Sequence, residues 1–442
     1  MEIKQIHEIN YAAQIVRLPA PYKHPNADRL QCVNIMHNIV ITGLNAKEGD
    51  LYVYFPLECQ ISKFYLKFTN SYSDANQNTD TTIKGFFDKK GRVRAVKLRG
   101  QPSMGYIVPL SDFITWLEEM IPEENLHPEQ LTEGLVFDTI EGYTICKKYI
   151  PEIQQKGPAR TEKQPKKVRH NRIIENQFRF HVDTLQLKRN LHMLNPDDII
   201  TISEKLHGTS LVCSNLLVKR KLKWYEKLAT KIGLKIKDTE YDIVYSSRNV
   251  IKNQYLEDKK TNHWYKEDIW GEASKVLGSA LQDGISIYAE VVGFTSKGNC
   301  IQKGYDYGCK QGQFEIYVYR MTSTNQSGDV IEFTTGQMLN YCNKYNLKTV
   351  PIHYHGRLKD YHKELLDATN DQIREQFINQ LTTTYLESNC RMCNNKVPTE
   401  GVVVTVEKDQ FEAYKLKSFA FFEQETKALD KDEVDLETSE SE

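Results

Sequence analysis

Short apolar segments separated by turn residues fill the first third of the chain. Five of them are rich in Val, Ile and Tyr and are bounded by Gly, Pro, Asn or Asp; they cover residues 30–36, 38–44, 50–56, 92–100 and 104–110. Segments of this length and composition predict β-strands, whereas the polar, aperiodic residues 72–83 predict a long loop. Several short strands with little helix between them favour a small β-barrel domain over residues 1–148.

The rest of the chain mixes strand-like and helix-like patterns. Apolar runs predict strands at residues 198–206, 242–248, 285–293, 314–321 and 400–406, and helical patterns cover residues 263–281, 334–347 and 370–386. These elements predict a second domain over residues 177–428, so the fold class is α+β. Residues 149–176 contain three prolines and many charges without an apolar period, which predicts a linker. The acidic residues 429–442 predict a disordered tail.

Composition adds little beyond the class of protein. None of the apolar runs in the 442-residue sequence approaches the roughly 20 residues that span a bilayer, and the N-terminus does not resemble a signal peptide. Nine scattered cysteines fit reduced thiols better than a disulfide framework. We therefore expect a cytoplasmic protein without a membrane segment, and nothing in the sequence requires more than a monomer.

Charge is distributed unevenly along the chain. The formal net charge is −1, yet residues 147–176 carry nine Lys and Arg against three Asp and Glu. In the predicted strand at 92–100, basic residues alternate with apolar ones: Arg92, Arg94, Lys97 and Arg99. Because side chains alternate along a strand, this basic face could follow a nucleic-acid backbone. A solvated outer face explains the same pattern equally well.

Six short motifs in the second domain carry the candidate chemistry. They are EKLHGTS (204–210), SSRNV (246–250), YAEVVG (288–293), FEIYVYRM (314–321), EGVVV (400–404) and YKLKS (414–418). In this order they resemble the covalent nucleotidyltransferase superfamily of ligases and capping enzymes, whose nucleophile lies in a Lys-x-Asp-Gly motif. Here the motif has His207 in place of Asp, and this variant is similar to RNA ligases that seal nicks.

Two further stretches strengthen the resemblance. CIQKGYDYG (300–308) and FHVDTLQLKRN (180–190) are similar to segments of RNA ligases, and the N-terminal module resembles a branch with an N-terminal OB domain. The resemblance implies an OB-like β-barrel followed by a nucleotidyltransferase domain, similar to the ATP-grasp ligases, of antiparallel sheets and helices. It also implies ATP and Mg²⁺ or Mn²⁺ as cofactors, and RNA as the partner.

The resemblance assigns Lys205 as the nucleophile. A lysine must be neutral to attack phosphorus, although its reference pKa is about 10.4, and nearby cations favour the neutral amine. Lys415 and Lys417 lie two residues apart, so on a strand they would face the same side, and we expect both to contact the α-phosphate. Glu400 is implied to bind the hydrated metal, and Glu290 to contact the ribose or a metal-bound water.

The remaining assignments concern the nucleotide. The planar guanidinium of Arg248 can donate paired hydrogen bonds to a phosphate or to the sugar. Tyr319 matches the family position whose ring stacks on adenine, with Tyr317 as the alternative. Relatives have an acid after this ring, but here the next residue is Arg320. Glu204 could read the adenine amino group, and a structural role is nearly as well supported.

Two other features have open interpretations. His207 could serve as a general base, but we favour an orienting role because relatives use an Asp without acid–base need. Cys390 and Cys393 form a C-x₂-C pair that would need Cys342 or His353, His355 or His362 to complete a zinc site. We favour two thiols in a turn.

The sequence therefore predicts an ATP-dependent RNA ligase that acts on nicked duplex RNA or an RNA–DNA hybrid. A DNA ligase or a capping guanylyltransferase would share the lysine chemistry. A nucleic-acid-binding protein without catalytic activity is the alternative of a different class, and the intact set of Lys and Glu residues argues against it.

Overall fold

The computed structural model describes residues 1–151, 172–252, 267–362, 368–431 and 433. The chain forms two compact units, Met1–Pro151 with Phe419–Glu433, and Glu152–Ser418 with Val434–Glu442. The predicted linker at 149–176 and the predicted tail at 429–442 lie largely outside the described residues. The last helix belongs to the first unit, whereas the sequence assigned residues up to 428 to the second domain.

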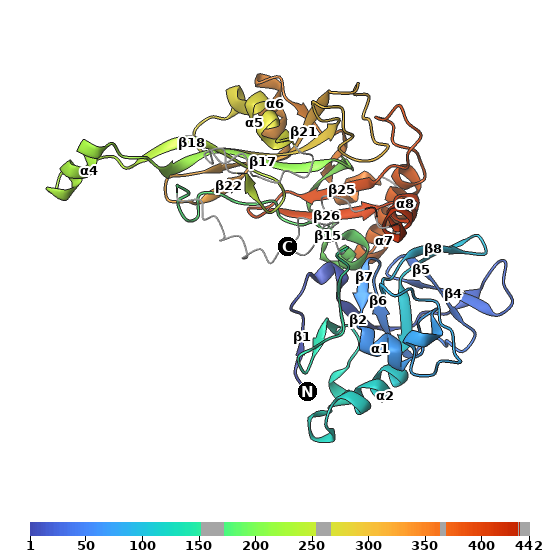
Figure 1. The fold of residues 1–442 in the computed structure, drawn as a ribbon. Coiled ribbons are helices and arrows are strands. Elements are labelled where there is room, and N and C mark those ends of the chain that lie inside the picture. Colours follow the sequence, from blue (N-terminus) through green and yellow to red (C-terminus); the bar gives the residue numbers. More distant parts are fainter. Residues whose placement is uncertain (152–171, 253–266, 363–367, 432, 434–442) are drawn as a thin grey trace. The chain divides into compact units, whose positions relative to one another are not determined.

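The first unit is built from small antiparallel sheets (Figure 1). Its central sheet has the order β10-β6-β2-β11. The strands of the unit are β1 (Ile3–Lys4), β2 (Ala13–Arg17), β3 (Tyr22–Lys23), β4 (Leu30–Ile35), β5 (Asn38–Gly43), β6 (Leu51–Phe55), β7 (Cys59–Ile61), β8 (Ala95–Leu98), β9 (Gln101–Met104), β10 (Tyr106–Pro109), β11 (Val136–Phe137), β12 (Thr139–Ile140), β13 (Tyr143–Thr144) and β14 (Cys146–Lys148). In the described part of this unit, no sheet closes into a barrel.

Strand β6 shows how the sequence builds this unit. Val53 and Phe55 pack into one hydrophobic core, and Tyr52 and Tyr54 pack into another. Because neighbouring side chains on a strand point to opposite faces, the apolar run LYVYF buries both faces of the sheet. Helices α1 (Lys63–Phe68) and α2 (Leu110–Met120) contribute aromatic and aliphatic side chains to the first of these cores.

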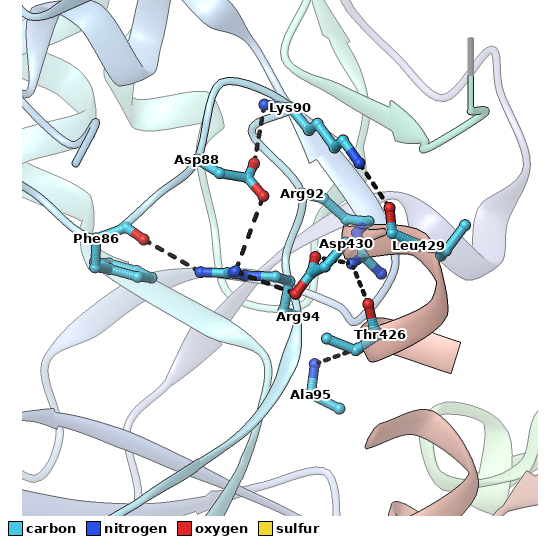
Figure 2. Close-up of polar contacts among 9 residues, drawn as sticks. All are labelled: Phe86, Asp88, Lys90, Arg92, Arg94, Ala95, Thr426, Leu429 and Asp430. Atoms are coloured by element: carbon cyan, nitrogen blue, oxygen red, sulfur yellow. Dashed lines mark hydrogen bonds and ion pairs between the residues drawn. The ribbon is translucent and has the colours of Figure 1, made fainter. Parts of the chain in front are cut away.

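Helix α8 (Phe419–Asp430) is held in the first unit by basic residues, as Figure 2 shows. The Arg92 guanidinium is 1% exposed and donates through Nη2 to Asp430 Oδ1 at 2.8 Å and to the Thr426 carbonyl at 3.2 Å. Lys90 Nζ donates to the Leu429 carbonyl at 2.6 Å. These cations satisfy carbonyls in the last turn of the helix, where a positive charge also complements the helix dipole.

These contacts correct part of the predicted nucleic-acid face. Arg92 is buried and paired with Asp430, so it cannot follow a phosphate backbone together with the other three residues. Arg94 Nη1 lies 3.5 Å from the same carboxylate. Lys97 and Arg99 are exposed. Strand β8 covers only Ala95–Leu98 of the predicted strand and contains one of the four basic residues, Lys97. The partner that buries Arg92 comes from far along the chain.

The second unit contains two sheets. The larger has the order β19-β18-β17-β20-β21-β22, with β23 parallel to β21, and the smaller has the order β15-β26-β25-β16-β24. Their strands are β15 (Leu185–Gln186), β16 (Ile199–Lys205), β17 (Thr209–Lys219), β18 (Thr239–Ser246), β19 (Ile251–Lys252), β20 (Ile285–Gly293), β21 (Phe314–Thr324), β22 (Val330–Glu332), β23 (Lys348–Thr349), β24 (Ile352–Arg357), β25 (Gly401–Val406) and β26 (Glu412–Lys417).

Each sheet buries one face against helices. The helices of this unit are α3 (Leu187–Asn190), α4 (Trp224–Lys231), α5 (Ile269–Leu277), α6 (Thr335–Lys344) and α7 (Asn370–Leu381). The larger sheet packs against α5 and α6 through one core, and the smaller sheet packs against α7 through a second core. The polar residues that alternate with these core positions are left for the opposite faces. In the described part of the chain, no helix is long and apolar enough to cross a membrane.

The buried Arg92–Asp430 pair generates a stability prediction. Asp430→Asn should lower the free energy of local opening of α8 by about 2 kcal/mol, because a buried guanidinium loses its charged acceptor. Native-state hydrogen exchange of the α8 amides measures this change. Asp371→Asn is the matched control, because Asp371 is 90% exposed in its pair with Arg374. Unchanged protection of the α8 amides from hydrogen exchange in Asp430→Asn would show that the Arg92–Asp430 pair does not hold the helix.

Candidate active site

The candidate nucleophile lies where the two sheets of the second unit are joined. Lys205 is the last residue of β16 in the smaller sheet, and Thr209 is the first residue of β17 in the larger one. Only three residues separate them, so the turn is tight. At Gly208 an added Cβ would lie 2.4 Å from the Val291 carbonyl oxygen, which is closer than any side chain allows. Glycine is therefore required directly after His207.

Three side chains hold this turn. The His207 backbone N–H donates to the Tyr307 hydroxyl at 2.6 Å, and the Gly208 N–H donates to Glu290 Oε1 at 3.0 Å. Gln302 Nε2 donates to the Gly208 carbonyl at 2.8 Å. The turn after Lys205 is thus fixed by β20 and by the 300–308 segment, which explains why that stretch accompanies the lysine motif.

A buried carboxylate lies among the basic side chains of the site. Glu400 is 4% exposed, and its Oε1 lies 2.8 Å from Lys205 Nζ and 3.5 Å from Lys417 Nζ. Its Oε2 lies 3.9 Å from His207 Nδ1. Burial alone would raise the pKa of Glu400, but Lys205, Lys417 and His207 outweigh it and lower the pKa. Glu400 is therefore an ionised carboxylate among three basic side chains.

Strand register explains this arrangement. Gly401 of β25 pairs with Lys205 of β16 on one side and with Lys417 of β26 on the other. Directly paired residues in a sheet point to the same face, so the two lysines flank the start of β25. A Cβ at Gly401 would lie 1.9 Å from the Leu416 carbonyl oxygen, and φ is +142° there. Glycine after Glu400 allows the three strands to meet.

A second group of charges surrounds Lys415. Desolvation and the neighbouring Lys417 lower the pKa of Lys415 to about 8; Lys205 and Arg248 act in the same direction, and Asp183 opposes them. Arg248 is hydrogen-bonded to Asp183. Burial would raise the pKa of Asp183, but Arg248 outweighs it and lowers the pKa. Lys415, Arg248 and Asp183 therefore belong to the same site as Lys205.

A β-bulge places Tyr319 at a cavity. Tyr288 pairs with Arg320 whereas the next residue, Ala289, pairs with Val318, so Tyr319 is the extra residue in β21. Tyr319 and Arg320 consequently both line a cavity of about 540 Å³, although adjacent strand residues normally face opposite ways. The other sheet contributes side chains two apart on β16 to this cavity, at Thr201 and Ser203.

Polar contacts fix both residues of the bulge. The Tyr319 hydroxyl is hydrogen-bonded to His181 Nδ1 at 2.8 Å. Arg320 Nε donates to Glu332 at 3.0 Å, and its guanidinium lies 4.2 Å from the ring centres of Tyr288 and Phe411. The positive charge next to Tyr319 is thus neutralised within the cavity wall.

Comparison with known families shows the identity of this domain. The RNA ligase family model matches residues 198–419, which include every strand of the site described above. The chain belongs to the RNA ligase family. Among the curated proteins no match was found.

Solved structures share the fold of this RNA ligase over nearly its whole length. A lysine-to-methionine mutant of Naegleria gruberi RNA ligase with AMP and Mn has a TM-score of 0.55 and 16% identity, covering 93% of this chain and 98% of that one. A lysine-to-alanine mutant with ATP and Mn has a TM-score of 0.56 and 15% identity, covering 95% and 99%. The same ligase with PPi has a TM-score of 0.55 and 16% identity, covering 94% and 98%. At such low identity these structures show the fold alone.

The structure brings most of the sequence-predicted residues of this unit together. Lys205, Lys417 and Glu400 are in direct contact, Lys415 and Arg248 lie around Asp183, and Glu290 holds the nucleophile turn. Tyr319 lines the cavity, whereas Tyr317 lies on β21 opposite Glu290.

Glu204 does not belong to this group. Its carboxylate is hydrogen-bonded to His353 Nε2 at 2.8 Å and to Thr399 Oγ1 at 2.9 Å. On β16 it pairs with Val402, which is part of the core on the far face of the sheet. Adjacent strand residues face opposite sides, so the Glu204 carboxylate points away from the Lys205 side of the sheet, and these contacts fit the structural role that the sequence also allowed.

Sequence reasoning missed several residues of the site. Asp183, His181, Tyr307 and Gln302 contact the predicted residues, and all four lie in the stretches 180–190 and 300–308 that the sequence singled out only as resemblances. In the described residues no group of three or more His, Cys, Asp and Glu could hold a metal ion.

The lowered pKa of Lys415 predicts a pH-dependent stability. Above pH 8 the folded protein loses this proton, while the unfolded chain keeps it to about 10.4, so the unfolded state binds more protons in that window. The free energy of unfolding of the wild type, relative to Lys415→Met, should therefore rise with pH between about 8 and 10.

Urea unfolding across this pH range, with fluorescence as the signal, measures the difference. Lys344→Met, at an exposed position on α6, controls for the loss of a surface lysine. If the difference in the free energy of unfolding between wild type and Lys415→Met stays constant from pH 8 to 10, Lys415 does not lose its proton in the folded state in this range.

Proposed function

We propose that this protein is an ATP-dependent RNA ligase that joins a 5′-phosphate to a 3′-hydroxyl, in nicked duplex RNA or in an RNA–DNA hybrid. The contact between the Lys205 amine and the buried Glu400 carboxylate, with Lys417 beside it, carries this proposal. A nucleophilic amine among cations at the end of two sheets suits attack on a phosphate. The family and the ATP and AMP complexes of the structural neighbours support it.

In the first step, the Lys205 amine attacks the α-phosphorus of ATP. A phosphorus–nitrogen bond forms, the bond to the β-phosphate oxygen breaks, and pyrophosphate leaves with its electron pair. Lys205 must first separate from Glu400 and give up a proton, since an ammonium group has no lone pair. Lys415 and Lys417 then lie where negative charge increases on the phosphate oxygens, and they stabilise it.

The later steps transfer AMP. The 5′-phosphate of the RNA displaces Lys205 from AMP, and the 3′-hydroxyl then attacks the adenylylated phosphate and releases AMP. Side chains do little covalent chemistry after Lys205, so orientation and charge supply most of the acceleration. Arg248, which is held by Asp183, is suited to orient a phosphate or the ribose.

The donor set of the site fits a hard divalent cation. Glu400 Oε2 is buried and has no hydrogen-bond partner within the described part of the chain, which leaves an anionic oxygen for a ligand. Glu400, with Glu290 as the second carboxylate, would hold Mg²⁺ or Mn²⁺. Such an ion would add positive charge beside the phosphates.

The first unit is proposed to act as an OB-like nucleic-acid module. Its small antiparallel sheets and the exposed side chains of Lys97 and Arg99 support this role. Contacts from such residues would position the RNA without reading its sequence. Arg92 is not among them, because its guanidinium is buried against α8.

Labelling with radioactive nucleotide tests the first step. Incubation with α-³²P-ATP and a divalent metal should transfer label to the wild type and not to Lys205→Ala, because only an amine forms the phosphoramidate. A denaturing gel measures the label. Lys359→Ala, at a lysine paired with Asp197 on the surface, is the matched control and should be labelled fully. Label from GTP instead would indicate a capping enzyme, and no label with any metal would overturn the proposal.

The stacking role of Tyr319 has its own test. Tyr319→Ala should raise the KM for ATP by about 10-fold in the labelling reaction, because base–aromatic stacking is lost. Tyr319→Phe keeps the ring and loses only the hydroxyl, with its bonds to His181 and Ser210, so its KM should stay close to that of the wild type. If Tyr317→Ala raises the KM and Tyr319→Ala does not, Tyr317 is the stacking residue.

A further inference from the structure

The hairpin that follows the nucleophile motif ends in a strongly basic segment. Residues 219–238, here called the basic tip, join β17 to β18 and contain α4. They carry eight Lys and Arg against two Asp and Glu. Arg220 pairs with Glu226 at 2.7 Å, so this acid is neutralised inside the tip.

The other cations of the tip face solvent. Seven lysines remain after the Arg220–Glu226 pair, and all of them are exposed: Lys219, Lys221, Lys223, Lys227, Lys231, Lys235 and Lys237. Residues 172–252, 267–362 and 368–418 offer no carboxylate within ion-pair distance of any of these lysines. Seven like charges so close together repel one another, and a polyanion would relieve that repulsion.

The tip also exposes large rings and aliphatic side chains. Trp224 is 78% exposed and Tyr225 is 50% exposed, with their ring centres 6.0 Å apart in an edge-to-face arrangement. Leu228 and Ile232 are 56% and 74% exposed. A folded domain rarely leaves a cluster of this kind uncovered unless it contacts a partner.

The position of the tip relative to the nucleophile is set by a continuous ribbon. Strand β17 begins directly after Gly208, and its pairing with β18 extends from Val212 to Lys219. At about 3.3 Å per residue, Lys219 lies roughly 33 Å from Thr209. Figure 1 shows α4 at the outer end of this hairpin, beyond the other labelled elements of the second unit.

We propose that the basic tip is a second RNA-binding site, which holds the RNA strand at a distance from the ends that are joined. The inference rests on the proposed function for the nature of its partner. The lysines would contact phosphates, and Trp224 and Tyr225 would stack on unpaired bases. A basic surface interleaved with aromatic rings is the combination that binds single strands without sequence preference.

An anionic membrane is the other polyanionic surface that such a segment could meet. Helix α4 has only eight residues, and Glu226 lies between its exposed rings and Leu228. A membrane-surface helix requires a longer uninterrupted apolar face. The aromatic pair beside the lysines, on a protein of the RNA ligase family, favours RNA.

Binding to an RNA that cannot be ligated tests the tip. The probe is an RNA with a 5′-hydroxyl in place of the 5′-phosphate, used in two lengths. In the long form the RNA extends from the ends to be joined by more than the roughly ten nucleotides that 33 Å spans, and in the short form it extends by fewer. Fluorescence anisotropy gives the affinity of the wild type, of Lys223→Glu/Lys227→Glu/Lys231→Glu and of Trp224→Ala/Tyr225→Ala. The matched control is Lys275→Glu/Lys310→Glu/Lys344→Glu, at exposed positions of the same unit.

The expected results separate the tip from the rest of the enzyme. The lysine variant should bind long RNA with a salt slope shallower by about 2, since each lost phosphate contact removes about 0.7. The aromatic variant should bind about 10-fold more weakly, and both should match the wild type on short RNA and in labelling by ATP. The control variant should behave as the wild type throughout.

Three outcomes would overturn the inference. The tip variants could bind long RNA with the same affinity as the wild type, or the control variant could lose as much affinity for long RNA as the tip variants do. In the third outcome, the tip variants lose affinity for phosphatidylserine vesicles and not for RNA. If ATP labels no variant, the wild type included, while the difference on long RNA persists, the ligase proposal fails and the tip remains an RNA-binding site.

Discussion

The buried carboxylate of Glu400 is the constraint on which the active site depends. A carboxylate that is 4% exposed is costly unless cations and hydrogen bonds compensate for its lost hydration, and here Lys205 and Lys417 do so. This requires β16, β25 and β26 to be in register at Gly401. The same pairing keeps the Lys205 amine in an ion pair with Glu400.

Chain connectivity joins this site to the first unit. Lys417 is the last residue of β26, and α8 begins two residues later at Phe419. The far end of α8 is held by Arg92 and Lys90 within the first unit. Helix α8, which follows the lysine strand directly in the sequence, therefore belongs to the first unit. Part of the segment that the sequence predicted as a nucleic-acid face, at Arg92, instead binds this helix.

Local patterns in the sequence predicted much of the second unit. The apolar run at residues 198–206 predicted β16, and the spacing of Lys415 and Lys417 placed both on one face. Applied to Glu204, the same rule predicts that its side chain faces away from that of Lys205, because adjacent strand residues face opposite sides. Burial of Arg92 could not be predicted, since its partner Asp430 is 338 residues away. The bulge at Tyr319 has no signal in the sequence either.

That bulge accounts for a departure from the family pattern. The family resemblance implies an acid after the aromatic ring, but this chain has Arg320, and on a regular strand the side chains of Tyr319 and Arg320 would face opposite ways. The extra residue turns both toward the same cavity, so an unpaired guanidinium there would leave a positive charge in its wall without a counter-charge. Glu332 neutralises Arg320, and the rings of Tyr288 and Phe411 fix its plane. The positive charge thus remains part of the wall of the cavity that Tyr319 also lines.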